Sequence, residues 1–234
     1  MIVIEGSARA VFPDLAVRAL RIEGFVAAAD AVDMADLEIR VQEAVARREA
    51  GEMTWRSAYK RMGLKPSKFL SSVEALSKRA AKTGSGWKTG WKAIDIYNAI
   101  SIIHGAPLGC YDADALGDAD IFIRPVNRDL DRFTPVGGKI DISNGSDDLL
   151  VYAVGHEILC WALNHRDSAT FCLKAGTRTA VVASESVSPE QHDVSRAAMT
   201  ELASLLESHG AAVGEIEQSL ATETIPSEDS GGHP

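Results

Sequence analysis

Apolar side chains recur every three or four residues in five segments, which is the spacing of one face of an α-helix. Helices are expected over residues 33–51 and 54–63. A third should begin at Lys65-Pro66-Ser67, because proline suits the first helical turn, and should end near Gly84. The last two cover 94–104 and 189–209.

The helix at 189–209 has the clearest boundaries. Ser188 can cap it, Pro189 takes the first helical position and Gln191 can close a capping box. After this helix the chain becomes acidic and polar, so residues 213–234 are expected to be an acidic disordered tail.

Residues 94–112 combine a buried helix with a turn. Isoleucines form one apolar face of the helix, which also carries Asn98 and ends at Gly105. Pro107 and Gly109 predict a rigid turn with open backbone N–H groups. The pattern favours a pocket lined by one fixed amide, although a core helix followed by its capping turn explains it too.

Short runs rich in β-forming residues predict strands at 2–4 and 15–22, and again within a β-rich region at 118–185. The candidates in that region are 120–124, 139–142, 149–154, 157–163, 170–173 and 177–184. The two runs around Gly155-His156 predict an antiparallel hairpin. We expect residues 1–212 to form a single domain with a helical N-terminal half and a C-terminal helix.

The composition favours a globular protein. The chain has 234 residues, 46% of them apolar, which is enough for a sizeable core. No apolar run is long enough to cross a bilayer, and the first residues lack the features of a secretory signal. Cys110, Cys160 and Cys172 are odd in number and form no C-x-x-C pair, which argues against a disulfide framework or structural zinc. The cytoplasm is the default location, without a membrane partner.

The charge distribution is strongly asymmetric. The formal net charge is −9, yet residues 54–92 contain ten basic residues and one acidic residue, so that segment carries +9 and the remainder −18. Five aromatic residues lie in the same segment: Trp55, Tyr59, Phe69, Trp87 and Trp91. Basic side chains can bind phosphates and aromatic rings can stack on bases, so this combination fits single-stranded RNA or a tRNA end. A basic solvated face whose aromatic residues point inward fits equally well.

Polar groups are dense at 161–168. Arg166 can bind a phosphate or carboxylate through two hydrogen bonds, and Asn164, Asp167 and Ser168 can hold an amine, a hydroxyl or a water. A polar turn explains the same residues.

Other motifs are weaker. Gly137 and Gly138 permit close backbone approach to a ligand, or simply form a turn. His156-Glu157 lacks the second histidine of H-E-x-x-H, and no spacing of His156, His165 and Cys160 matches a known metal site. We therefore expect no metal, no cofactor and no activated nucleophile.

The segment DIYNAISIIHGAPLGCYD resembles the D-x-x-N-Y-x(6)-G-x-P-x-x-x-[FY]-D segment of the B3/B4 editing domain in the phenylalanyl-tRNA synthetase β subunit. The following order is also similar: DIFIRPV, TPVGGK, VYAVGHEILCWAL, NHRDS and TRTAVVASE. The resemblance covers about residues 11–187, as in a free-standing version of that domain.

The resemblance implies an α+β fold of three layers, with a β-sandwich of unusual topology flanked by helices. It also implies a pocket in which water hydrolyses a mischarged aminoacyl-tRNA. Asn98 and Pro107 match the family's asparagine and proline, whereas Gly109 replaces a substrate-contacting histidine and Tyr97 replaces a threonine. These departures leave the amino acid open.

The roles that we assign to individual residues in this reaction are hypotheses. Asn98 and backbone groups near Gly109 would position the carbonyl or water, and Arg166 and Asp167 would hold the ribose or the amino group. The candidate residues are: catalytic, Asn98 and Asp167; substrate-binding, Pro107, Gly109, Gly137, Gly138, Asn164, Arg166 and Ser168; RNA-binding, Arg56, Lys60, Lys65, Lys68, Lys88 and Lys92. The expected partner is tRNA rather than DNA. The alternatives are a non-catalytic RNA-binding module and an amino-acid sensor.

Overall fold

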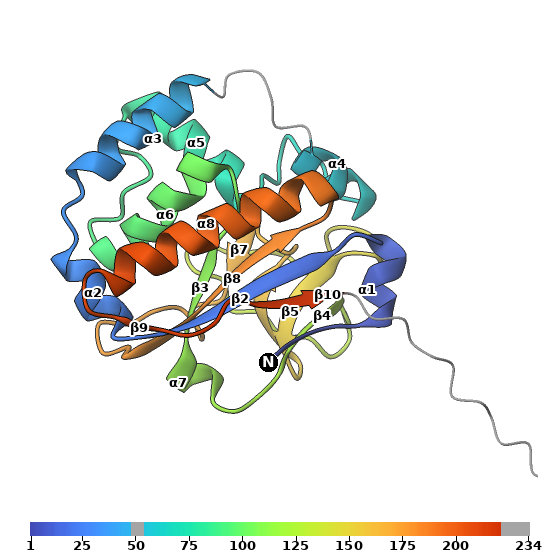
Figure 1. Cartoon of the computed structure of the whole chain (residues 1–234). Helices are drawn as coiled ribbons and strands as arrows, with labels where there is room; N and C mark the ends of the chain where they lie inside the picture. Colours follow the sequence, from blue (N-terminus) through green and yellow to red (C-terminus); the bar gives the residue numbers. More distant parts are fainter. Residues whose placement is uncertain (48–53, 221–234) are drawn as a thin grey trace, which may run out of the picture.

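A computed structural model describes residues 1–47 and 54–220 (Figure 1). Within them the chain forms eight helices and two β-sheets, so the expected α+β class is confirmed.

The first sheet has the strand order β1-β4-β5-β6-β7. Its strands are β1 (Ile2–Ile4), β4 (Ile121–Pro125), β5 (Leu150–Val154), β6 (Glu157–Trp161) and β7 (Arg166–Asp167). β1 pairs parallel with β4, and the remaining neighbours are antiparallel. The predicted hairpin is confirmed as β5–β6, and Gly155 in its turn has a φ of 56°.

The second sheet has the order β10-β2-β8-β3, with β9 also on β2. Its strands are β2 (Ala16–Glu23), β3 (Gly109–Asp112), β8 (Thr179–Ser186), β9 (Ala212–Val213) and β10 (Glu217–Leu220). β10 contradicts the disorder expected from residue 213, because backbone pairing with β2 orders a polar segment whose composition does not predict a strand. The rest of the expected tail, 221–234, lies outside the described residues.

The helices gather mainly on one side of the second sheet, where α2, α3, α5, α6 and α8 lie together (Figure 1). Their bounds are α1 (Gly6–Val11), α2 (Phe25–Ala31), α3 (Ala35–Arg47), α4 (Thr54–Arg61), α5 (Ser72–Thr83), α6 (Lys92–His104), α7 (Ala113–Leu116) and α8 (Pro189–Glu207). The predicted helices at 54–63, 94–104 and 189–209 are confirmed. The predicted end of the 33–51 helix lies outside the described residues.

Two predicted strands are wrong, and one predicted helix starts later than expected, although it ends before Gly84 as predicted. The helix expected from Lys65 begins at Ser72, because Ser71 caps it by accepting a 3.2 Å hydrogen bond from Glu74 N. Residues 139–142 have no regular structure apart from a turn at Ile142, and residues 170–173 contain a turn and one isolated bridge, from Cys172 to Tyr111. Gln191 also departs from a capping box, since it accepts a 2.8 Å bond from Val187 N instead.

Two apolar cores explain the layering. One lies between the sheets and includes Ile123, Trp161 and Val17, and the other lies between the second sheet and the helices and includes Leu20 and Ile100. Since the second sheet contributes residues to both cores, it is covered on both faces.

The aromatic residues of segment 54–92 belong to these cores. Trp55, Tyr59, Phe69 and Trp87 are buried, with exposed fractions of 8% or less. They therefore offer no stacking surface for RNA bases, so the expectation of exposed rings is wrong for these four. For these four residues the alternative prediction, in which the aromatic side chains point into the core, is the correct one.

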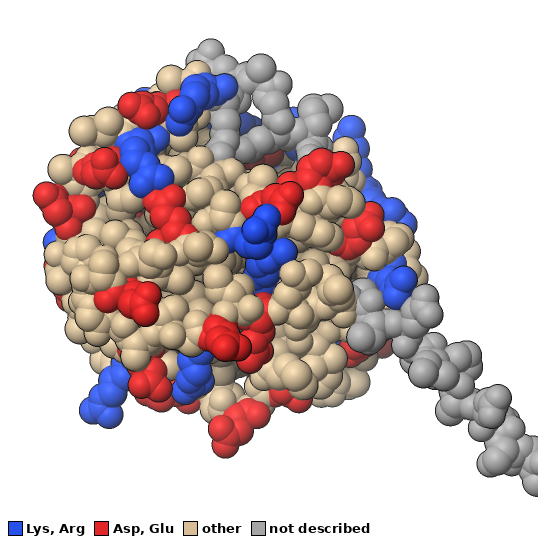
Figure 2. Space-filling view, in the orientation of Figure 1, with Lys and Arg blue, Asp and Glu red and all other residues tan. Residues whose placement is uncertain are grey.

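The visible surface carries both charges interspersed, with no large patch of one sign over α8 and the neighbouring sheet edge (Figure 2). Among the described residues, no helix combines the length and the apolar character that a membrane crossing requires.

Candidate functional site

A cavity of about 310 Å³ lies between α5, α6, β3 and the turn that joins β6 to β7. We call it the α5–α6 cavity. Four predicted site residues line it: Asn98, Asn164, Arg166 and Asp167. Residues about seventy positions apart in the chain are thus brought together. Among the described residues, no group of three or more His, Cys, Asp or Glu is arranged to hold a metal.

Asn98 is buried on α6, with its side chain at the cavity wall. Its Nδ2 donates a 3.1 Å hydrogen bond to Trp87 O. Because a carbonyl can only accept, this contact fixes the amide orientation and leaves Oδ1 as an acceptor for a ligand or water. Asp95, one turn earlier, accepts bonds from Thr89 and Gly90, so α6 holds the 87–91 loop at two points.

Asn164 reaches the cavity through an unusual turn. The preceding residues Ala162 and Leu163 have φ values of 56° and 62°, which non-glycine residues rarely adopt. Asn164 Oδ1 accepts a 2.8 Å bond from the Tyr59 hydroxyl, and its Nδ2 donates a 2.6 Å bond to Glu185. Both ends of the Asn164 amide are therefore hydrogen-bonded within the protein, and these bonds hold this part of the cavity wall in place.

Glu185 is a buried carboxyl group behind that wall. Burial raises its pKa to about 7, although hydrogen bonds from Asn164 and Tyr152 oppose the shift. The Tyr152 hydroxyl donates to it at 2.9 Å. Near neutral pH this carboxyl group therefore exists in both protonation states.

Asp167 is the carboxylate at the cavity. The Tyr111 hydroxyl donates a 3.3 Å hydrogen bond to its Oδ1. Burial raises the Asp167 pKa, whereas hydrogen bonds from Cys160 and Tyr111 and the Arg166 charge act against the shift. The lining residue Tyr97 has its pKa raised well above the ordinary value, mainly by burial, so its phenol stays neutral. Asp167 can accept a proton or hold a cationic amine.

Two guanidinium groups line the same cavity. Arg166 Nη1 donates a 3.0 Å bond to Val136 O, which anchors it at the mouth. Arg79 projects from α5, whose face toward the cavity also carries Ser72 and Leu76. Burial, and then repulsion by Arg166, lower the Arg79 pKa.

Among the lining residues to which the sequence assigned no binding or catalytic role are three polar ones: Arg79, His165 and Tyr97. The helical spacing of Ser72, Leu76 and Arg79 could have placed Arg79 on the cavity face of α5. His165 Nδ1 lies 2.7 Å from Leu70 O, and because a carbonyl oxygen can only accept a hydrogen bond, Nδ1 carries the hydrogen and Nε2 is the acceptor of the neutral ring. Burial lowers the His165 pKa and favours that neutral form.

The remaining predicted substrate-binding residues do not line the cavity. Gly109 starts strand β3 opposite Ala183 rather than an open turn, and a Cβ there would overlap the Tyr111 hydroxyl. Ser168 is buried, with Oγ accepting a 3.2 Å bond from Thr170 N. The others, Pro107, Gly137 and Gly138, are also absent from the lining, although Val136 next to the glycine pair takes part.

Half of the predicted RNA-binding residues already have partners in the fold. Arg56 pairs with Glu74, and Lys88 pairs with Glu38. Lys92 Nζ donates to the carbonyls of residues 30 and 32, at 3.0 and 2.9 Å. The other three, Lys60, Lys65 and Lys68, are exposed, and Lys68 lies over the Phe69 ring at 5.1 Å.

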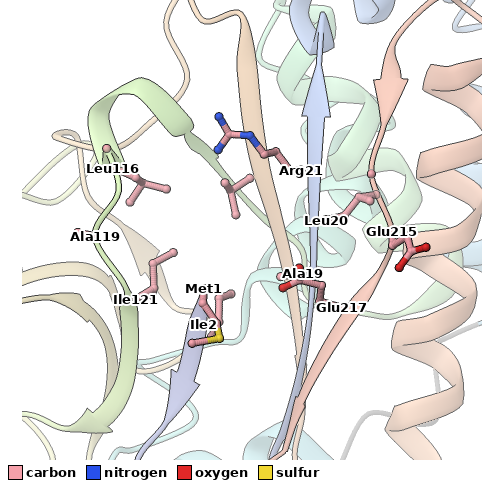
Figure 3. A pocket seen from close by; sticks show the side chains of 13 residues that line it. Met1, Ile2, Ala19, Leu20, Arg21, Leu116, Ala119, Ile121, Glu215 and Glu217 are labelled. Atoms are coloured by element: carbon pink, nitrogen blue, oxygen red, sulfur yellow. The ribbon is translucent and has the colours of Figure 1, made fainter.

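A second hollow of about 250 Å³ lies between the N-terminus, β2 and β10 (Figure 3). Apolar side chains such as Ile2 and Ile121 line it, together with Arg21, Glu215 and Glu217. It contains none of the predicted site residues. The α5–α6 cavity is therefore the candidate site.

Comparison with known proteins gives one family match. The family model described as "B3/4 domain" matches residues 54–211, which include every residue of the α5–α6 cavity named above. A crystal structure of an N-terminal fragment of the phenylalanyl-tRNA synthetase β subunit from Pyrococcus horikoshii is similar, with a TM-score of 0.45 and 9% identity. The similarity covers 91% of this chain and 50% of that one, so the chain spans about half of its length. No curated protein matches.

Proposed function

Because the chain belongs to the B3/4 domain family, we propose that it binds the aminoacyl end of tRNA in the α5–α6 cavity and hydrolyses mischarged aminoacyl-tRNA. The observation that carries this proposal is the convergence of Asn98, Arg166 and Asp167 on one cavity. An amide, a guanidinium and a partly buried carboxylate together suit an ester that bears an amine and a ribose.

The reaction requires little from the protein. Water attacks the ester carbonyl carbon, the bond to the ribose oxygen breaks, and that oxygen leaves with a proton. Aminoacyl esters are intrinsically labile, so orientation of water and polar stabilisation of the developing charge are sufficient. We assign Asn98 to positioning the water or carbonyl, and Asp167 to accepting the proton of the water or holding the amino group.

The proposed RNA surface is smaller than the basic segment suggests. Lys60, Lys65 and Lys68 are exposed and are assigned to phosphates of the acceptor stem. Arg56, Lys88 and Lys92 already hold the protein together, so their contribution to RNA affinity should be lower. Exposed lysines imply binding that weakens as salt rises.

Deacylation of a panel of mischarged tRNAs tests the proposal. Asn98→Ala and Asp167→Asn are each expected to lower the rate by at least about tenfold, since each removes a group in contact with the reacting ester. Gln42→Ala is the matched control. Like Asn98, Gln42 donates a side-chain amide hydrogen bond to a backbone carbonyl, at 2.8 Å to Gly84 O, but Gln42 does not line the cavity. If none of the mischarged tRNAs is hydrolysed, the proposed hydrolase activity is rejected.

A second candidate is binding of a free amino acid. Arg166 and Asp167 line the same cavity, where they could meet the carboxylate and ammonium groups of one zwitterion. The burial of Trp55, Tyr59 and Trp87 favours this alternative, because it removes stacking surfaces for RNA. Calorimetric titration with free amino acids, compared with uncharged tRNA, separates the two functions.

A further inference from the structure

The α5–α6 cavity carries more positive charge than its own carboxylate balances. Arg79 and Arg166 both line it, as does the single carboxylate of Asp167. Among the described residues neither guanidinium has an ion pair with a carboxylate, in contrast to Arg56, whose partner is Glu74. Arg166 donates to Val136 O, and a carbonyl does not neutralise a cation.

Two neighbouring guanidinium groups repel each other, and an anion bound between them offsets that repulsion. Arg79 feels that repulsion, because the Arg166 charge lowers its pKa in addition to the effect of partial burial. The planar donors of arginine match the paired oxygens of a phosphate. The α-carboxyl group of an aminoacyl-tRNA is esterified, so the nearest anion that every such substrate shares is the phosphodiester of its terminal nucleotide.

We infer that Arg79 and Arg166 form a phosphate subsite at the mouth of the α5–α6 cavity. It receives the phosphodiester that joins the last two nucleotides of an RNA 3′ end. This inference rests on the proposed function and extends it, because it assigns Arg79 to substrate binding and fixes where the strand enters. The terminal ribose then reaches Asn98 and Asp167 deeper in the cavity.

Binding can be measured without catalysis. The probes are adenosine bearing a 3′-aminoacylamino group, whose amide is not hydrolysed, and the same compound extended by a 5′-linked cytidylate. A panel of alanyl, seryl, threonyl and tyrosyl forms covers different side chains. Cys172 lines the cavity and is partly exposed, so protection of Cys172 from iodoacetamide reports occupancy.

The extended probe should protect wild-type Cys172 at about tenfold lower concentration than the nucleoside, because only it carries the phosphodiester. Arg79→Ala should abolish that advantage while leaving nucleoside binding unchanged, and Arg79→Lys should restore part of it. Lys82→Ala is the control, since Lys82 is exposed on the same helix but does not line the cavity. Thermal melting checks that each variant is folded.

The subsite is overturned if both probes protect equally, if neither protects, or if Arg79→Ala weakens both alike. These results are separate from the test of hydrolysis. Deacylation without a phosphate advantage rejects the subsite alone. An Arg79-dependent phosphate advantage without deacylation rejects the hydrolase and leaves the subsite. If free amino acids protect Cys172, and this protection depends on Arg166 but not on Arg79, then Arg166 binds a carboxylate. That result would also overturn the phosphate subsite.

Discussion

The side-chain nitrogen of Asn164 donates a 2.6 Å hydrogen bond to the buried carboxyl group of Glu185. The Tyr59 hydroxyl donates to the oxygen of the same amide at 2.8 Å. A single asparagine thus joins the candidate site to the core between the two sheets.

Asn164→Ala should lower the free energy of unfolding by about 3 kcal/mol, because it leaves the buried Tyr59 hydroxyl without its acceptor and leaves one oxygen of the buried Glu185 carboxyl group without its donor, so that only the Tyr152 hydroxyl still donates to that carboxyl group. Tyr59→Phe removes only one donor and should cost about 1 kcal/mol. Urea denaturation of both variants measures the difference. Equal losses would contradict the view that the amide, rather than the phenol, holds this network together.

Glu185 should make stability depend on pH near neutrality. Its folded pKa of about 7 lies above the ordinary value of 4.5, so between these values the folded state binds more protons than the unfolded state. Its contribution is therefore fully present below about pH 4.5 and is lost as the pH rises through 7. The loss amounts to about 3 kcal/mol.

Glu185→Gln removes this titration while keeping the side-chain shape. Denaturation curves of wild type and variant between pH 5 and 8 are compared, which cancels the titration of other groups. The stability of the wild type relative to the variant should fall across this range. A constant difference would show that Glu185 does not titrate there.

Arg124 and Asp131 form a second buried pair, with two 2.8 Å hydrogen bonds. The Asp131 side chain has no exposed surface, and a backbone bond from Asn127 N also reaches it. Arg124→Met should cost about 3–5 kcal/mol, because it leaves a buried charge without its cation. Thermal unfolding at pH 7 measures this, with exposed Arg178→Met as the control.

Low pH should weaken the stabilisation that the Arg124–Asp131 pair provides. The Asp131 pKa is below its ordinary value because hydrogen bonds from Arg124 and Asn127 N outweigh the opposing effect of burial. This contribution is present above the ordinary value of 3.8 and is lost as the pH falls through the folded pKa. Arg124→Met should therefore lose less stability than wild type between pH 5 and 2, and an equal loss would contradict the assignment.

The spacing of apolar residues predicted correctly those elements whose formation depends on neighbouring residues in the sequence. It placed the helix that carries Asn98 and the β5–β6 hairpin, because their apolar spacing and glycine boundaries are local. It failed for β10, whose polar residues become a strand only by pairing with β2. It also failed for Gly109, which was expected in a turn but lies in a strand whose partner, β8, is distant in sequence.

The residues that line the α5–α6 cavity differ in the same way. Asn164, Arg166 and Asp167 could be predicted as candidates because their polar groups are concentrated in one short segment, whereas Arg79 was only one of ten basic residues. Its position depends on which face of α5 meets the cavity, and that is decided by packing.

The three cysteines should differ in reactivity. Cys110 and Cys160 are buried, and burial raises the pKa of each thiol well above the ordinary value. Cys172 is partly exposed. Because the thiolate is the reactive form, iodoacetamide should modify Cys172 first in the folded protein and all three cysteines after denaturation. Mass spectrometry of peptides gives the order, and Cys172→Ser should remove the fast phase.

Gly109 should be required because of Tyr111. A Cβ at Gly109 would overlap the Tyr111 hydroxyl and lie 2.9 Å from its Cζ, although the glycine backbone itself is ordinary strand. Gly109→Ala should therefore push the phenol away from Asp167 and cost about 1–3 kcal/mol, the usual cost of overpacking. Urea denaturation measures this cost.

A double-mutant cycle with Tyr111→Phe tests the cause. Phenylalanine lacks the hydroxyl, which is the atom nearest to the added Cβ, so Gly109→Ala should cost less in that background. Ala183→Gly is a control at the paired position of β8. If Gly109→Ala costs the same with or without the hydroxyl, its effect arises from the strand and not from the contact that holds Tyr111 against Asp167.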